Sequence, residues 1–248
     1  RILYLQEDIV LNFKEMLFGA MDELIISDPW LHSTDIGPVI DKSAKDRINS
    51  YINKARKEKR VLKEINCEKN ELFIPPTVIK INGIRHMKEE IFGPILHIAT
   101  FKASELEKIV DDINASGYGL TFGLHTRIDD RVEKIPSNLN VGNIYVNRNQ
   151  IGAIVGSQPF GGEGLSGTGP KAGGPNYLNK FILDQQCEWK KSEMLNLLQL
   201  DVIQNAINNI NKSSFKKLKS VQLPGPTGES NVLSFFSRGL ILCLGPTL

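Results

Sequence analysis

The sequence predicts an α/β domain with a largely parallel sheet, and the order of strand-like and helix-like patterns along the chain supports this fold class. Short apolar runs typical of buried strands alternate along the chain with amphipathic segments of helical period. Such alternation is typical of strand–helix–strand units, whose strands run parallel. The balance of 30 basic and 28 acidic residues gives no electrostatic reason to expect nucleic acid or an anionic membrane as a partner.

The first part of the chain is expected to contain one strand and two helices. Residues 1–6 (RILYLQ) read as a strand, after which Asp8 is placed to cap a helix. A second helix is expected over residues 44–59, with Ile48, Ile52 and Ala55 on its buried face. The apolar positions that predict the buried face of the first helix are Ile9, Phe13, Met16, Leu17, Ala20, Met21 and Leu24.

Further strands and helices follow in alternation. Residues 72–81 are expected to be extended because their two prolines exclude a helix, and strands are expected within 94–101, 119–126 and 142–147. Ser104 and Glu107 form a capping-box pattern for a helix that Gly117 ends, and a short helix is expected over 129–135. The predicted buried face of the capped helix consists of Leu106, Ile109, Val110 and Ile113.

Targeting and metal-binding signals are absent from the sequence. No apolar run approaches the roughly 18 residues of a membrane helix, and Arg1 opens a strand-like segment, so we expect no signal peptide. The three cysteines, Cys67, Cys187 and Cys243, are isolated and have neither disulfide nor metal-site spacing, and the four histidines are scattered. These features predict a cytoplasmic protein without a metal site.

The glycine-rich segment 159–175 (PFGGEGLSGTGPKAGGP) contains two near-matches to phosphate-binding patterns. Gly162, Gly164 and Gly167 fit the dinucleotide fingerprint, and Gly164 and Gly169 have phosphate-loop spacing before Lys171. The fingerprint needs a strand before the glycines and a helix after them, whereas prolines lie on both sides here, and Pro170 separates Gly169 from Lys171. We therefore expect these glycines to permit tight turns and close backbone approach rather than phosphate binding.

Several stretches together carry a family resemblance. Residues 142–175 (GNIYVNRNQIGAIVGSQPFGGEGLSGTGPKAGGP) resemble the end of an aldehyde dehydrogenase catalytic domain, and 27–41 (SDPWLHSTDIGPVID), 89–101 (EEIFGPILHIATF) and 113–127 (INASGYGLTFGLHTR) agree, in the family's order. More narrowly, they are similar to the L-glutamate γ-semialdehyde (pyrroline-5-carboxylate) dehydrogenase domain of bifunctional proline utilisation A. The segments 223–231 and 238–247 resemble the C-terminal extension of long members of that family.

The resemblance implies a mechanism in which a cysteine thiolate attacks the aldehyde, hydride passes to NAD, and water releases the acid. It places the nucleophile a few residues before Arg1. The Rossmann-type N-terminal half, the general-base glutamate and the oxyanion-site asparagine are also implied to lie upstream of Arg1. None of Cys67, Cys187 and Cys243 is expected to replace the nucleophile, so we assign no catalytic residue and expect the isolated chain to be inactive.

The resemblance implies that two ligand-binding segments of the family are present in this chain. In 89–94 (EEIFGP) the family uses the second carboxylate, Glu90, to hold the nicotinamide-ribose hydroxyls of NAD, and Phe92 packs against the cofactor. In 151–156 (IGAIVG) the backbone N–H groups of Gly152 and Ala153 bind the α-carboxylate of the aldehyde substrate. The residues implied to shape the pocket wall are Pro159, Phe160, Gly161 and Gly162. Without the resemblance, Glu89 and Glu90 would read as an exposed charge pair and Gly152 as a plain turn.

The predicted organisation has three parts: a partial catalytic domain over 1–180, a diverged helix or linker over 181–222, and the start of a truncated extension over 223–248. The implied partners are the upstream half of the dehydrogenase and a small aldehyde, with an oligomer possible, and FAD is expected only if a proline dehydrogenase domain accompanies the chain. The alternatives are a non-catalytic remnant or interaction module of a split gene, and a small thiol enzyme.

Overall fold

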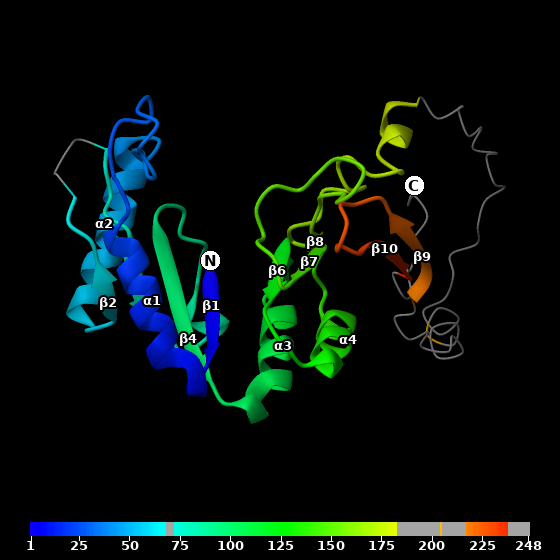
Figure 1. The fold of residues 1–248 in the computed structure, drawn as a ribbon, viewed down its shortest axis with the longest axis horizontal. Helices are drawn as coiled ribbons and strands as arrows, with labels where there is room; N and C mark the ends of the chain where they lie inside the picture. Colours follow the sequence, from blue (N-terminus) through cyan, green and yellow to red (C-terminus); the bar gives the residue numbers. More distant parts are fainter. Residues whose placement is uncertain (68–71, 183–203, 205–216, 238–248) are drawn as a thin grey trace. The chain divides into compact units, whose positions relative to one another are not determined.

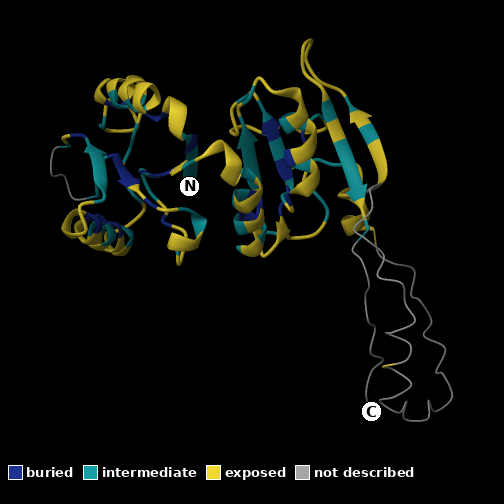
Figure 2. Ribbon diagram, turned by 90° about the horizontal axis from the view of Figure 1, so that it is seen from below, coloured by how far each residue is buried: buried dark blue, intermediate teal, exposed yellow. Residues whose placement is uncertain are grey.

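The computed structural model describes residues 1–67, 72–182, 204 and 217–237 (Figure 1). The chain divides into two units, one formed by Arg1–Tyr118 with Ile128–Asn140 and the other by Gly119–Arg127 with Val141–Leu248. The boundary falls within the predicted domain 1–180, so each unit is described by itself. Figure 2 shows buried residues on strands and exposed residues along much of the helices.

Unit 1 is organised around a four-stranded sheet in the order β1-β4-β3-β2. β1 (Ile2–Gln6) and β3 (Thr77–Lys80) both run parallel to β4 (Ile95–Phe101), which lies between them. β2 (Val61–Glu64) pairs antiparallel with β3 and was not predicted, because its four half-buried residues carry little apolar signal. The expected strands and the largely parallel sheet are confirmed.

The second predicted helix is present as α2 (Lys42–Lys57). The Asp41 carboxylate accepts a hydrogen bond from the Ala44 N–H at 2.7 Å, which caps the helix. Ile48, Ile52 and Ala55 are almost fully buried, as predicted. They pack in one cluster with Ile74, Ile79, Ile91 and Ile95.

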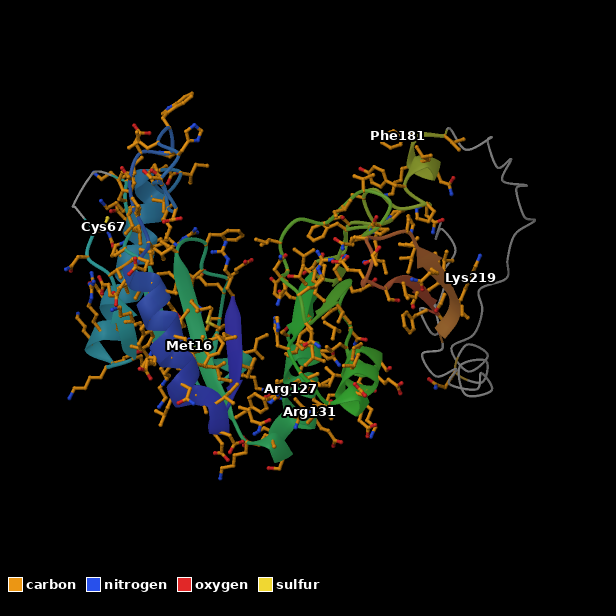
Figure 3. All side chains as sticks on the ribbon, in the orientation of Figure 1. Met16, Cys67, Arg127, Arg131, Phe181 and Lys219 are labelled. Carbon is orange, nitrogen blue, oxygen red and sulfur yellow. The ribbon has the colours of Figure 1, made fainter. Side chains whose placement is uncertain are left out.

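The first helix forms, but its start and its buried face differ from the prediction. A 3₁₀ turn, η1 (Glu7–Ile9), precedes α1 (Val10–Asp22), and the Asp8 carboxylate accepts a hydrogen bond from the Gln6 side chain instead of capping the helix. Val10 and Met21 are buried, whereas Met16, labelled in Figure 3, is 77% exposed. The apolar stripe is wider than the surface that covers it, so its flank at Ile9, Phe13, Met16 and Ala20 is exposed among the described residues.

The capping box of the third helix lies two residues earlier than predicted, because a 3₁₀ turn precedes the helix. The chain enters through η3 (Ala103–Glu105), and the Glu105 carboxylate accepts a hydrogen bond from the Lys102 N–H at 2.8 Å, so the box of Ser104 and Glu107 is wrong by two residues. α3 (Leu106–Ala115) buries Val110 and Ile113 of the predicted face and leaves Leu106 and Ile109 half-buried. Gly117 ends the helix with a φ of 75°. α4 (Asp129–Asn138) runs three residues past the predicted helix and contains a proline.

Strand pairs also form in unit 2. β6 (Thr121–Leu124) and β7 (Asn143–Val146) run parallel, as expected of the two predicted strands. β9 (Lys217–Leu223) and β10 (Asn231–Phe236) form an antiparallel hairpin, and residues 224–230 connect the two strands. Residues 217–222 were expected in a linker but form β9, because pairing with the more apolar β10 stabilises a segment whose own apolar signal is weak.

Short elements complete the described chain: η2 (Ile84–His86), β5 (Tyr118–Gly119), β8 (Glu163–Gly164) and η4 (Leu178–Phe181). The helix predicted within 181–222 falls largely outside the described residues, as do Cys187 and Cys243. Among the residues that are described, no helix combines the length and apolarity needed to span a membrane.

The core around α2 gives the first testable prediction. Ile52→Ala removes a side chain that is 1% exposed, and we expect the free energy of unfolding to fall by about 2–5 kcal/mol. Ile40→Ala is the matched control, because Ile40 is 89% exposed and its truncation should change stability by less than about 0.5 kcal/mol. Urea unfolding checks both, and equal losses would contradict the assigned core.

Candidate functional site

The predicted cofactor segment joins η2 to β4 in unit 1 and alternates between core and surface. Ile91 is 5% exposed and packs with the α2 cluster, whereas Glu90 and Phe92 on either side of it are exposed, Phe92 by 60%. The Glu90 carboxylate makes no hydrogen bond or salt bridge to another described residue. Burial of Ile91 therefore fixes the segment and leaves a carboxylate and an aromatic ring available to a ligand.

Gly93 ends this segment in a conformation that other residues rarely adopt. Its φ is 135°, and a Cβ there would lie 2.7 Å from the Cδ1 of Ile48. Its carbonyl accepts a hydrogen bond from the Arg1 guanidinium at 2.7 Å, and the Pro94 carbonyl accepts one from the Thr77 N–H at 2.9 Å. The turn is thus fixed to both β1 and β3.

A buried histidine on β4 ties the start of β1 to α2. His97 has no exposed surface, and its Nδ1 lies 3.0 Å from the Arg1 carbonyl while its Nε2 lies 2.8 Å from the Tyr51 hydroxyl. A carbonyl can only accept, so Nδ1 carries the proton and Nε2 accepts from Tyr51. Burial lowers the pKa of His97, although the bond to the Arg1 carbonyl opposes this, and burial raises the pKa of Tyr51.

The predicted substrate-binding loop follows β7 in unit 2. Gly152 has a φ of 77°, and both Gly152 and Ala153 are exposed. The Ile151 N–H bonds the Asn149 side chain, and the Gln158 N–H donates to the Ile154 carbonyl at 2.7 Å. The N–H groups of Gly152 and Ala153 have no hydrogen-bond partner among the described residues. Hydrogen bonds therefore hold the loop at both ends, and the adjacent N–H groups of Gly152 and Ala153 face solvent.

The predicted pocket wall lies directly after this loop and depends on glycine for its packing. Pro159, Gly161 and Gly162 are buried, while Phe160 is 37% exposed and exchanges two backbone hydrogen bonds with Ala172, at 2.8 and 2.9 Å. A Cβ on Gly142 would collide with the Gly161 carbonyl. A Cβ on Gly162 would lie 2.5 Å from the Ser166 carbonyl. These contacts agree with the interpretation that the glycines permit close backbone approach.

Other glycines of the segment 159–175 line, with Gly162, a small hollow that does not suit phosphate. Its volume is about 190 Å³, and its walls are Gly162, Glu163, Gly164, Gly167 and Gly169. The Glu163 carboxylate would repel an anion, and no α-helix begins within residues 170–182, which directly follow the glycines, to supply a favourable dipole. The geometry therefore agrees with the rejection of phosphate binding.

Sequence reasoning missed a buried polar network beneath the wall. The Lys171 ammonium donates to the Gly142 carbonyl at 2.5 Å, the Gly161 carbonyl at 2.6 Å and the Asn143 Oδ1 at 3.3 Å. Burial lowers the pKa of Lys171, and the Glu163 carboxylate raises it. The signal that could have found this network is the single lysine among the glycines of 161–174.

A second interaction missed from the sequence joins the hairpin to β7. The Arg148 guanidinium pairs with the Glu229 carboxylate at 2.9 Å and lies 5.6 Å from the centre of the Tyr145 ring. Glu229 is in the β9–β10 turn, so this contact holds the turn against the end of β7. No pattern in the sequence links two residues that are so far apart in the chain.

The described residues contain no cluster of histidine, cysteine or carboxylate side chains that could hold a metal ion. Cys67, labelled in Figure 3, is half-buried after β2 and lies in neither predicted binding segment.

Comparison with known proteins identifies the family. The model of the aldehyde dehydrogenase family matches residues 1–186. The chain belongs to this family.

Proteins similar to this aldehyde dehydrogenase family member agree with the narrower resemblance. It is 40% identical to the bifunctional protein PutA of Klebsiella aerogenes over 98% of the chain and 21% of that protein. It is 38% identical to a 1-pyrroline-5-carboxylate dehydrogenase of Bacillus cereus over 70% of the chain and 34% of that enzyme. The chain thus spans about a fifth of the length of the curated PutA relatives it matches.

Solved structures show the same relationship. A crystal structure of Bradyrhizobium japonicum proline utilization A superposes with a TM-score of 0.70 at 48% identity, covering 73% of this chain and 18% of that one. The corresponding protein of Bdellovibrio bacteriovorus gives a TM-score of 0.67 at 32% identity, with 73% and 19% covered. The fold is therefore that of an aldehyde dehydrogenase, with mixed α/β content.

The buried His97 makes stability depend on pH. Its pKa is lower in the folded protein than the usual 6.5, so the unfolded chain binds the proton more readily as the pH falls below 6.5. The stabilising contribution is present above that pH and is lost progressively below it. We expect His97→Gln to be less stable than wild type at pH 8 and to lose less stability between pH 8 and pH 5.

Urea unfolding at intervals across this pH range measures the difference, with the exposed His32→Gln as the matched control. Parallel pH profiles for wild type and His97→Gln would show that His97 contributes nothing to the pH dependence.

Proposed function

We propose that this chain supplies a cofactor-binding and a substrate-binding segment to an NAD-dependent dehydrogenase that oxidises L-glutamate γ-semialdehyde to L-glutamate in proline catabolism. Membership of the aldehyde dehydrogenase family and similarity to PutA and 1-pyrroline-5-carboxylate dehydrogenases support the reaction class. The observation that carries the substrate assignment is the pair of unpartnered N–H groups at Gly152 and Ala153.

Those two donors suit a carboxylate. Backbone N–H groups form charge-assisted hydrogen bonds to an anion, and the positive φ of Gly152 orients successive peptide groups so that both can face one ligand. Glutamate semialdehyde carries an α-carboxylate at the end remote from its aldehyde. Binding of that end would orient the aldehyde, and Pro159, Phe160, Gly161 and Gly162 would form the wall beneath the loop.

The cofactor segment fits a nicotinamide nucleotide. An exposed carboxylate without a hydrogen-bond partner can accept two hydrogen bonds from a ribose diol, and Glu90 has this character. Phe92 presents an aromatic ring two residues further along, and the turn at Gly93 fixes both positions. NAD, when bound, supplies the hydride acceptor, and Glu90 and Phe92 would hold its nicotinamide-ribose end.

Catalysis is proposed to need the remainder of the enzyme. Neither Cys67 nor the two cysteines outside the described residues is proposed as the nucleophile, so the 248 residues alone should be inactive. One charge-assisted hydrogen bond contributes roughly 1.5–3 kcal/mol, whereas a millimolar complex needs about 4 kcal/mol. Glu90 alone is therefore too weak to retain NAD, and a dinucleotide-binding half must contribute the rest.

The same proposal covers the organisation and partners of the protein. Residues 1–180 would form part of the catalytic domain, 181–222 a connection that includes the start of β9, and 223–248 the beginning of an extension. The partners would be the upstream half of the dehydrogenase and the aldehyde. FAD would be present only with a proline dehydrogenase domain.

The experiment uses the complete native protein, assayed for NADH formation with glutamate semialdehyde and with butanal, which lacks the carboxylate. We expect kcat/KM to favour the semialdehyde by at least about tenfold, since one lost charge-assisted bond is worth roughly this factor. Equal efficiency would remove the carboxylate assignment. A folded but inactive native protein would favour the alternative of a non-catalytic remnant or interaction module.

The adjacent glutamates allow a matched test of the cofactor assignment. In the complete enzyme, Glu90→Ala should raise the KM for NAD by about 10- to 100-fold through loss of the ribose bonds. Glu89→Ala removes an equally exposed charge one residue away and should change this KM by less than about twofold. Equal effects of the two substitutions would indicate general electrostatics instead of a specific contact.

A further inference from the structure

The Lys171 ammonium has its hydrogen-bonding capacity filled by three acceptors from two parts of unit 2. Gly142 and Asn143 lie at the start of β7, and Gly161 lies in the wall after the substrate-binding loop. A lysine ammonium has three N–H donors, so each acceptor can receive one. Lys171 therefore joins β7 to the wall and has no donor left over for a ligand.

Asn143 extends the same network into the wall. Its Nδ2 donates to the Pro159 carbonyl at 2.8 Å, and its Oδ1 accepts from the Gly161 N–H at 3.0 Å as well as from Lys171. Asn143 is 9% exposed, so these bonds form where water competes little. Lys171 and Asn143 together hold residues 159–161 at both ends.

The backbone after Lys171 supports the substrate-binding loop directly. The Gly156 N–H donates to the Gly173 carbonyl at 3.0 Å, and the Cα of Val155 would lie 3.2 Å from a Cβ on Gly173. Ala172 pairs with Phe160 on the other side. The segment 171–174 thus touches both the wall and the loop that presents the two free N–H groups.

We propose that Lys171 is a positioning residue for the substrate-binding loop. Its ammonium fixes the wall against β7, and the segment 171–174 fixes the position of the loop in which Gly152 and Ala153 present their N–H groups. This inference rests on the proposed function, because it assigns the loop's ligand as a carboxylate. It gives the lysine of the glycine-rich segment an internal role in place of phosphate binding.

The test uses the complete enzyme with Lys171→Met, which keeps the side-chain length and removes all three donors. We expect the KM for glutamate semialdehyde to rise about tenfold, with the KM for NAD and the turnover of butanal changed by less than about twofold. The preference for the carboxylated aldehyde should therefore shrink by a similar factor. Lys171→Arg, which keeps charge and donors, should recover part of this preference.

Lys134→Met is the matched control, because the Lys134 side chain is 74% exposed and pairs only with a neighbour on α4 among the described residues. It should leave all kinetic constants at the wild-type level. If Lys171→Met is not recovered folded, Lys171→Gln carries the test, because its amide has two N–H donors on a shorter side chain and cannot serve all three acceptors. It should raise the KM for the semialdehyde by about threefold.

The outcomes separate this inference from the proposed function. An active wild-type enzyme whose preference for the carboxylated aldehyde survives in Lys171→Met, or in Lys171→Gln where that variant is needed, overturns the positioning role and leaves the function standing. Equal losses with both aldehydes and with NAD also overturn it, because they indicate a general structural role. A wild-type enzyme without carboxylate preference overturns the function itself.

Discussion

The substrate-binding loop and the wall beneath it depend on one close backbone contact, between Gly142 just before β7 and the Gly161 carbonyl. No side chain fits between them, so the two segments approach until their carbonyls can share a single ammonium. Without that approach Lys171 could not reach both acceptors, and leaving its half-buried ammonium unpaired would be costly. The position of the wall, and of the loop supported beside it, follows from this contact.

A different constraint acts in unit 1. There the cofactor segment is held by what it buries: Ile91 enters the α2 cluster, and the left-handed Gly93 lets the chain turn straight into β4. The neighbouring His97 is neutral because it is fully buried between a carbonyl and a hydroxyl. Rigid apolar packing below the segment leaves Glu90 and Phe92 exposed, which is what a ligand-binding segment requires.

The sequence predicted those elements whose pattern is local. The spacing of Ile48, Ile52 and Ala55 identified α2 and its buried face, and the run 94–101 identified β4, because in both cases burial follows the periodicity of the element itself. It failed for α1, where the apolar stripe is wider than the covered surface, so Met16 was assigned to the core although it is exposed. It also failed for β9, whose stability comes from its partner strand rather than from its own residues.

The site residues were predicted from motif resemblance, but the polar network behind them could not be predicted in that way. Glu90, Gly152 and Ala153 each lie within a recognisable string. The roles of Asn143 and Lys171 appear only when segments 28 residues apart meet, and nothing in their local spacing indicates that contact. The glycines indicated where backbone segments approach closely, because each close approach requires a glycine. They did not show which segments meet.

The most direct test of the central claim is a crystal structure of the complete enzyme with L-glutamate, the product of the proposed reaction, bound. We expect the α-carboxylate oxygens at about 3 Å from the backbone nitrogens of Gly152 and Ala153, with Lys171 still bonded to Gly142 and Gly161. A carboxylate held elsewhere, with those two N–H groups still facing solvent, would contradict that claim.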